Sequence, residues 1–223
     1  MHILTLIIKE DIMKYIFIAG APGSKWSSVS KNIRASASID KSDYSDKRTY
    51  WHDASGSLQL MHSGAYWDPG MEFGEEFDKL NTLKKDKCEA EFDRPFDPSC
   101  SKIKIIKSHV FCNHLDFIKN TWPDCPIILV HRTDDSCLGW WVKCGQFDIT
   151  YPLYHSYYSN LRTMANIIKN QNDGIATFSK QNSCTTMLNN LQICNELQLL
   201  APPGQEQIYL NDDVEVKLYH NQS

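Results

Sequence analysis

The chain has 223 residues, of which 42% are hydrophobic and 22% are charged. This is the ordinary composition of a globular protein that is long enough to bury its own core. The formal net charge of −4 excludes nucleic-acid binding through a general basic field, although it leaves room for a local basic pocket. We therefore expect a single domain over residues 1–223 without a nucleic-acid partner.

Eight cysteines invite a disulfide interpretation, but they are irregularly spaced and form no Cys-x-x-Cys pair. A chain of this length needs no covalent staples, so we predict reduced and mostly buried thiols. His109, Cys112 and His114 lie close together in the sequence, but a fourth metal ligand at a suitable spacing is missing. We therefore expect no zinc site.

The N-terminal residues 1–8 are apolar, but Lys9, Glu10 and Asp11 interrupt the run before the core of a signal peptide is complete. No apolar run approaches the length of a transmembrane helix. These features predict a cytoplasmic protein without a membrane partner. Residues 1–12 are expected to be dispensable or to come from an alternative start, because Met13 stands immediately before the first convincing strand.

The first predicted unit is a strand followed by a turn and a helix. Residues 14–19 (KYIFIA) form a nearly continuous apolar run, as expected of a strand that is buried on both faces. Gly20, Pro22 and Gly23 end this strand, and residues 26–38 predict a helix with serine near its start. Such a turn brings backbone N–H groups and the positive end of a helix dipole together, where they can bind a phosphate.

Side chains of the same turn supply further donors for a phosphate. These are Lys25 and the hydroxyls of Ser24, Ser27 and Ser28. The alternative interpretation is an ordinary tight strand-to-helix turn. The P-loop of NTPases is a poor match, because only two residues separate the glycines and a tryptophan follows the lysine.

Residues 40–100 are polar, rich in glycine, aspartate and aromatic residues, and interrupted by three prolines. We predict mostly loop here, with a short helix over 72–84. Insertions at the carboxyl ends of strands build ligand pockets in α/β folds, so we expect this segment to form a substrate pocket. The aromatic residues expected in its walls are Tyr44, Tyr50, Trp51, Tyr66, Trp67, Phe73, Phe92 and Phe96.

Regular periodicity returns after residue 100. A strand over 102–108, a helix over 113–122 and a strand over 126–131 predict two parallel strands joined by a right-handed crossover. The later predicted elements are helices over 138–143, 154–169 and 183–200 (the last capped by Ser183), a strand over 174–179, and edge strands over 207–210 and 214–218 in the tail 201–223. This order predicts a three-layer α/β fold around a central parallel sheet.

The strand over 102–108 leads directly into Lys107, Ser108 and His109. An imidazole at this place can act as a base near neutral pH, and the lysine can stabilise an anion beside it. Together with the phosphate-binding turn, these residues predict group transfer from a phosphorylated donor. The alternative for His109 is a buried, hydrogen-bonded histidine at the end of a strand.

Three blocks of the sequence resemble the sulfotransferase family that uses 3′-phosphoadenosine-5′-phosphosulfate (PAPS). The turn over 21–26 (APGSKW) is similar to the family's Lys-Ser-Gly-Thr-Thr-Trp loop, and Lys107-Ser108-His109 is similar to its Lys-Thr-His block. The third block is a strand that ends in an arginine, here Arg132, with aspartate a few residues later. The resemblance covers residues 14–200 and implies the P-loop-like sulfotransferase architecture.

The resemblance also implies how the donor is held. The turn, with Gly23, Ser24, Lys25, Ser27 and Ser28, would bind the 5′-phosphosulfate, and Trp26 would stack on the adenine. Ala21 stands where the family has its loop lysine, so Lys25 is expected to replace it.

The resemblance assigns the 3′-phosphate to Arg132, whose guanidinium presents a fork of donors. Trp140 stands where the family has a serine for this phosphate, so Ser136 is expected to substitute for it. The alternative is that Arg132 only bridges Asp134 or Asp135 on the surface.

These features predict a PAPS-dependent sulfotransferase that moves a sulfuryl group to a hydroxyl or amine of a small-molecule or glycan acceptor. His109 is the expected general base, and Lys107 and Lys25 are expected to stabilise the leaving phosphate of adenosine 3′,5′-bisphosphate (PAP). No metal is expected, because a sulfate ester carries less charge than a phosphate chain. The alternatives are a magnesium- and ATP-dependent small-molecule kinase and a nucleotide-binding module without activity.

Overall fold

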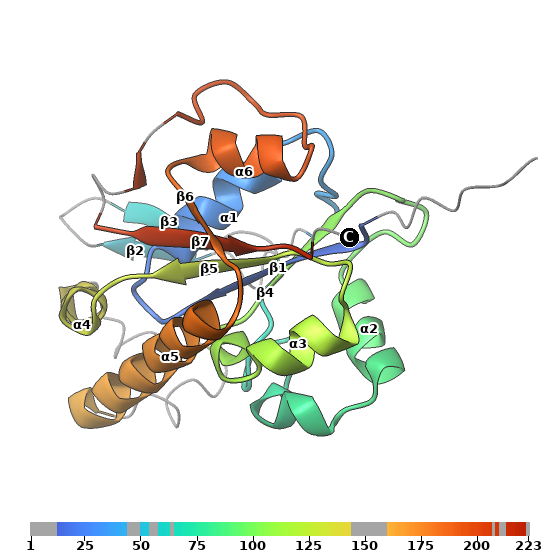
Figure 1. Cartoon of the computed structure of the whole chain (residues 1–223). Coiled ribbons are helices and arrows are strands. Elements are labelled where there is room, and N and C mark those ends of the chain that lie inside the picture. Colours follow the sequence, from blue (N-terminus) through green and yellow to red (C-terminus); the bar gives the residue numbers. More distant parts are fainter. Residues whose placement is uncertain are drawn as a thin grey trace, which may run out of the picture.

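The computed structural model describes residues 13–43, 50–53, 58–62, 65–143, 160–206, 208–209 and 213–221. Figure 1 shows an open five-stranded sheet with helices on both of its faces. The strands of this sheet are β1 (Tyr15–Gly20), β4 (Lys104–Lys107), β5 (Ile127–His131), β6 (Thr185–Met187) and β7 (Glu215–Tyr219), in the spatial order β4-β1-β5-β7-β6. The predicted α/β class is therefore confirmed.

The sheet is mostly parallel rather than wholly parallel. β1 lies parallel to both β4 and β5, and β7 pairs antiparallel with β5 and with β6. The tail strand that we expected over 214–218 is present as β7, but it lies inside the sheet and not at its edge. A separate antiparallel hairpin consists of β2 (Tyr50–Asp53) and β3 (Leu58–His62), in a segment that we predicted as loop.

Helices cover both faces of the sheet and form the outer layers (Figure 1). One face carries α1 (Trp26–Arg34) and α6 (Asn190–Glu196), and the other carries α2 (Lys85–Asp93), α3 (Leu115–Thr121) and α5 (Leu161–Gln181). The helix α4 (Asp134–Lys143) follows the carboxyl end of β5. Two 3₁₀ turns, η2 (Phe77–Thr82) and η3 (Val110–Asn113), complete the described elements.

Alternation along β1 divides the core into two halves. All six residues of this strand are buried, and successive side chains of a strand point to opposite faces. Ile16 and Ile18 belong to the cluster on the α1 side, whereas Tyr15 and Phe17 belong to the cluster on the α2 and α3 side. The apolar run over 14–19 is therefore explained as predicted, by a strand that is buried on both faces.

The strand predicted over 174–179 is wrong, because this segment is the last part of α5. Its apolar residues Ile175 and Phe178 continue a helical stripe that begins at Met164 and Ile168. Gly174 lies within this helix, and a Cβ there would come within 2.2 Å of the Cys112 carbonyl oxygen. The glycine thus marks the close approach of α5 to η3 and not a break in the helix. Residues 154–159 of the predicted preceding helix lie outside the described residues.

The helix predicted over 183–200 is shorter than expected. Thr185–Met187 form β6, which pairs with β7, and α6 begins only at Asn190. The Asn189 side chain caps this helix by accepting a hydrogen bond from the Gln192 N–H at 2.9 Å. The predicted cap Ser183 is therefore wrong. No strand is present at residues 208–209, and residues 207 and 210 lie outside the described residues.

Two further predictions need correction or completion. The helix predicted over 72–84 is the 3₁₀ turn η2, and the α-helix α2 follows it.

Seven cysteines lie in the described residues and all are free thiols, five of them buried. Cys144 lies outside the described residues.

Candidate functional site

The predicted site residues gather where β4, β1 and β5 end. The carboxyl ends of parallel strands meet at one edge of a sheet, which is where α/β folds bind ligands. Arg132, which follows β5, donates from Nη1 to the Gly23 carbonyl oxygen at 3.3 Å. His109, which follows β4 and Ser108, contacts the Gly20 carbonyl oxygen through Nδ1. The loop after β1 therefore joins residues from both neighbouring strands.

This loop is a tight turn whose conformation requires a glycine. The Ser24 N–H donates to the Ala21 carbonyl at 3.0 Å, and Gly23 has a φ of 82°. A Cβ on Gly23 would lie 2.4 Å from the Cys137 carbonyl oxygen of α4, so the glycine permits α4 to approach the loop. Ser24 is fully buried, and its Oγ has no hydrogen-bond partner among the residues that the structure describes. Its hydroxyl thus lies inside the protein rather than on the outer side of the loop.

The helix α1 begins at this loop with its positive end toward the site. Lys25 precedes the helix in a left-handed conformation with a φ of 66°, and no side chain caps the helix. Its first turn contains no acidic residue, so no carboxylate of that turn offsets the partial positive charge of the helix N-terminus. Ser27 is half-buried and Ser28 is exposed in this first turn. The predicted phosphate-binding turn therefore has the electrostatic character that an anion requires.

Lys107 is a buried lysine with an unusual environment. Its residue is only 7% exposed, and its Nζ lies 5.8 Å from the ring centroid of Trp26. Within the described residues, no hydrogen-bond acceptor or ion-pair partner of its ammonium is found. Burial lowers the pKa of Lys107 from 10.5 to about 8, and Asp43 opposes this shift only in part. A buried ammonium without a counter-ion is costly to the fold and points to an anionic ligand.

His109 is buried against two aromatic rings. The Trp26 ring lies 4.1 Å from it between centroids, and the Tyr66 ring meets it edge-on at 5.8 Å. A carbonyl oxygen can only accept, so the contact with Gly20 places the proton of a neutral imidazole on Nδ1 and leaves Nε2 as the acceptor. Burial lowers the pKa of His109 to about 3. The ring is therefore neutral at physiological pH, with a lone pair on Nε2, and it is a weaker base than the near-neutral imidazole expected from the sequence.

The turn that carries His109 is held by Asp68, a residue that the sequence analysis missed. The Asp68 carboxylate accepts from Ser108 Oγ at 2.7 Å and from the Val110 N–H at 3.3 Å. It thus binds the residues on both sides of the histidine and caps the start of η3 from 40 residues upstream. Burial raises the pKa of Asp68 to about 6, although the hydroxyls of Ser108 and Tyr66 oppose the shift.

Asp68→Ala is expected to lower the free energy of unfolding by about 1–3 kcal/mol, because it leaves the buried Ser108 hydroxyl without its acceptor and the Val110 N–H with Ser108 Oγ alone. Asp68→Asn retains an oxygen for both bonds and should cost less. The raised pKa of Asp68 means that the native state binds its proton more tightly, so wild-type stability contains a contribution that is lost as pH rises from about 4 through 6. Asp68→Asn should remove this pH dependence. Urea unfolding at pH 4, 5, 6 and 7 measures both effects. An alanine variant as stable as wild type would contradict the role of Asp68 in holding the turn around His109.

Arg132 is held by Asn172 of α5 and by Asp213, which lies just before β7. The Asn172 side chain of α5 donates to the Arg132 carbonyl at 2.8 Å and to Asp134 Oδ1 at 2.6 Å. The Arg132 guanidinium lies 3.5 Å from the Asp213 carboxylate, which also accepts from Ser136 Oγ at 2.6 Å. The ion-pair partner of Arg132 is thus Asp213, in place of the Asp134 or Asp135 considered from the sequence.

Most of the aromatic residues predicted for the substrate pocket are core residues. Trp67, Phe73, Phe92 and Phe96 are buried in the cluster that α2 and α3 cover, because the packed face of the sheet requires large apolar side chains there. Tyr66 alone of the described set contacts the site, through Trp26 and His109. Tyr44 lies outside the described residues, and the side chains of Tyr50 and Trp51 lie outside them too.

The three tryptophans near the site also differ in their surroundings. Trp26 is only 3% exposed and belongs to the core cluster on the α1 side. Its ring has no open face on which an adenine could stack in this structure. Trp141 is buried in the same cluster, whereas Trp140 is half-buried on α4.

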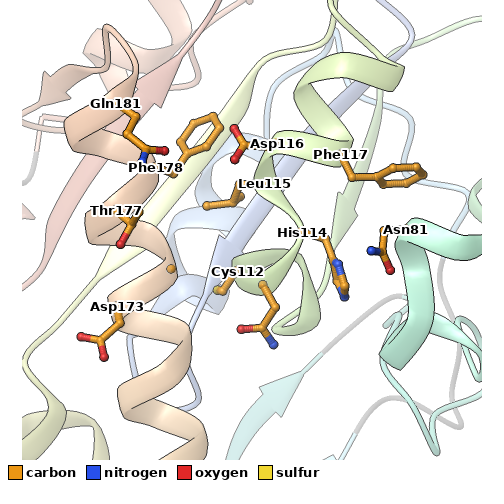
Figure 2. Close-up of a pocket in the computed structure, with 12 residues that line it drawn as sticks. Asn81, Cys112, His114, Leu115, Asp116, Phe117, Asp173, Thr177, Phe178 and Gln181 are labelled. Atoms are coloured by element: carbon orange, nitrogen blue, oxygen red, sulfur yellow. The ribbon is translucent and has the colours of Figure 1, made fainter.

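A separate cavity of about 510 Å³ lies between η3, α3 and α5, on the face of the sheet that α3 and α5 cover. Figure 2 shows Asp173, Thr177 and Gln181 of α5 along one side of it, and His114 beside Asn81 on the other. It includes none of the predicted site residues.

Within the described ranges, no three His, Cys, Asp or Glu side chains gather in a metal-binding arrangement. In the same ranges, no helix has both the length and the apolar character needed to cross a bilayer.

Comparison with known proteins adds no relative: no protein-family model, curated protein or solved structure matches this chain. Functional inference therefore depends on the geometry of the site and on the sequence blocks that form it.

Proposed function

We propose that this protein is a sulfotransferase that moves a sulfuryl group from PAPS to a hydroxyl or amine of an acceptor. The observation that carries this proposal is Lys107, a buried ammonium that makes no hydrogen bond or ion pair within the described residues and whose charge Asp43 offsets only in part. It lies at the same sheet edge as the N-terminus of α1, Lys25 and Arg132. Several positive groups around one loop favour a donor that carries more than one anionic group.

The donor would lie across the carboxyl ends of β4, β1 and β5. Its 5′-phosphosulfate would meet the N-terminus of α1 with Lys25, Ser27 and Lys107, and its 3′-phosphate would meet Arg132 with Ser136. Backbone N–H groups and cations at a helix N-terminus stabilise the charge that develops on a leaving phosphate. Ser24 is left out of this set because its hydroxyl is buried inside the loop.

Transfer would proceed by in-line displacement at sulfur. The acceptor oxygen forms a bond to sulfur while the bond between sulfur and the 5′-phosphate oxygen breaks, which releases PAP. The acceptor proton passes to His109 Nε2, the nitrogen that the Gly20 contact leaves unprotonated. Lys107 stabilises the charge on the departing phosphate oxygen. The protein needs no metal for this step, because positioning and fixed positive charge perform it.

PAP is expected to raise the melting temperature without added metal, since a ligand that binds only the native state stabilises it by mass action. At a concentration about 100 times its Kd, the stabilisation is about 2.7 kcal/mol, which corresponds to roughly 5–10 °C for a chain of this size. ATP with magnesium should give a markedly smaller shift. Differential scanning fluorimetry with PAP, PAPS, ATP and AMP, each with and without magnesium, measures the series.

The outcomes of this experiment separate the candidate functions. A larger response to magnesium and ATP than to PAP contradicts the sulfotransferase and favours a kinase. PAP binding without transfer to any of a set of phenol, sterol, sugar and amine acceptors favours a nucleotide-binding module.

A further inference from the structure

Asp213 occupies the subsite that the proposed function assigns to the donor's 3′-phosphate. Its Oδ2 accepts a hydrogen bond from Ser136 Oγ at 2.6 Å and lies 3.5 Å from Arg132 Nε. The hydrogen bond from Ser136, together with the charges of Arg132 and Lys25, holds the pKa of this carboxyl below its usual range. The Asp213 carboxylate thus interacts with Ser136 of α4, with Arg132 after β5 and with Lys25 before α1.

The fold itself places the carboxylate there. Antiparallel pairing of β7 with β5 sets Glu215 opposite His131 and Val216 opposite Val130, so the residues just before β7 run alongside the residues just after β5. Asp213 has a φ of 58°, a left-handed conformation that aspartate and asparagine tolerate better than most residues. The sheet register therefore brings this exposed carboxylate beside Arg132.

The Arg132 guanidinium still has unused donor capacity. Its Nε is buried and makes no hydrogen bond, although it lies near the Asp213 carboxylate. Its Nη1 makes two long contacts, with the carbonyls of Gly23 at 3.3 Å and Ser136 at 3.5 Å. An arginine fork binds a phosphate in a bidentate manner. A single, partly engaged carboxylate leaves this geometry incomplete.

We propose that Asp213 is an internal anion that competes with the 3′-phosphate for Arg132 and Ser136 and thereby selects a doubly charged group. This inference depends on the proposed function. A phosphate monoester carries a charge of about −1.5 to −2 near pH 7, so it can displace a carboxylate that carries a single charge. Singly charged anions gain little from the exchange. Asp213 is thus a specificity-determining residue, and its presence lowers donor affinity in return for selectivity.

Asp213→Asn tests this role, because asparagine keeps the left-handed backbone and removes only the charge. Isothermal titration calorimetry should show PAP binding about five- to tenfold tighter, as expected when a unit charge is removed about 4 Å from the ligand in a hydrated site. AMP, which has no 3′-phosphate, should bind the variant and wild type equally. Glu215→Gln is the matched control, because it removes an exposed carboxylate two residues away and should change neither affinity.

A double-mutant cycle with Arg132→Ala isolates the interaction. On that background, Asp213→Asn should no longer tighten PAP binding. Equal PAP affinity of wild type and Asp213→Asn overturns the role of Asp213 and leaves the proposed function intact. An equal gain in affinity for AMP and PAP also overturns it, since the removed charge would then act on any nearby anion and not on the 3′-phosphate in particular. Absence of PAP binding in wild type and in Asp213→Asn overturns the proposed function itself and the role of Asp213 with it.

Discussion

Lys107→Met is expected to stabilise the unliganded protein and to abolish its response to PAP. Methionine fills a similar volume without a charge, so it removes the desolvation cost of the buried ammonium. Burial lowers the pKa of Lys107 from 10.5 to about 8, which corresponds to a destabilisation of about 3 kcal/mol at neutral pH. A gain in stability that accompanies a loss of binding is the pattern expected where a protein retains a strained group for function.

The pH dependence of stability provides a second measure of the same lysine. Between about pH 8 and 10.5, the unfolded chain holds a proton on Lys107 that the native protein has lost. Wild-type stability should therefore contain a contribution that rises with pH through this window. This contribution should be absent in Lys107→Met, as urea unfolding at pH 7, 8, 9 and 10 would show.

Lys104 offers a matched control on the same strand. It is buried to a similar degree at the other end of β4, but its Nζ lies 2.8 Å from the Asp93 carboxylate. Lys104→Met removes one partner of an existing pair, so it should destabilise the protein and leave PAP binding unaffected. If Lys107→Met destabilises the protein as Lys104→Met does, or if it still binds PAP with wild-type affinity, Lys107 is an ordinary structural lysine.

The parts of the fold that follow from local pattern could be predicted from the sequence. The runs over 14–19, 102–108 and 126–131 are present as β1, β4 and β5, because strands buried on both faces must be apolar throughout. The segment 174–179 could not be assigned in the same way. Its short apolar run fits a strand and a helical stripe equally well, and only its packing on η3 through Gly174 decides between them.

The position of β7 also depended on information outside its own segment. An apolar run near the end of a chain does not show whether it pairs on one side or on two. Here the strand inserts between β5 and β6, and this pairing brings Asp213 to Arg132. Long-range register therefore determined both the topology and part of the site.

The candidate site was predictable where its residues follow strands directly. His109 and Arg132 come just after β4 and β5, and the carboxyl-edge rule for parallel strands brings them to the loop after β1. The supporting residues Asp68 and Asn172 carry no such signal, because each reaches the site from about 40 residues away. An isolated aspartate or asparagine in a sequence is far more often a surface or turn residue than a clamp.

His109→Asn is expected to lower sulfuryl transfer by at least about a hundredfold, the usual contribution of a positioned general base. The asparagine amide can still donate to the Gly20 carbonyl in place of Nδ1, but it has no basic nitrogen at the position of Nε2. PAP affinity should remain nearly unchanged, because the proposed function assigns the imidazole to the acceptor and not to the nucleotide. Turnover of radiolabelled or fluorogenic donor, together with PAP calorimetry, measures the two quantities separately.

His109→Ala is the companion variant, because it removes both ring nitrogens and the contact with Trp26. It should match His109→Asn in transfer and fall below it in thermal stability, since alanine leaves a cavity beside the indole ring. Because burial lowers the pKa of His109 to about 3, kcat/KM of wild type should show no change near pH 6.5. It should decline above about pH 8, where Lys107 loses its proton. Transfer by His109→Asn within about tenfold of wild type is too small a loss for a general base, and would leave His109 as a structural link between Gly20 and Trp26.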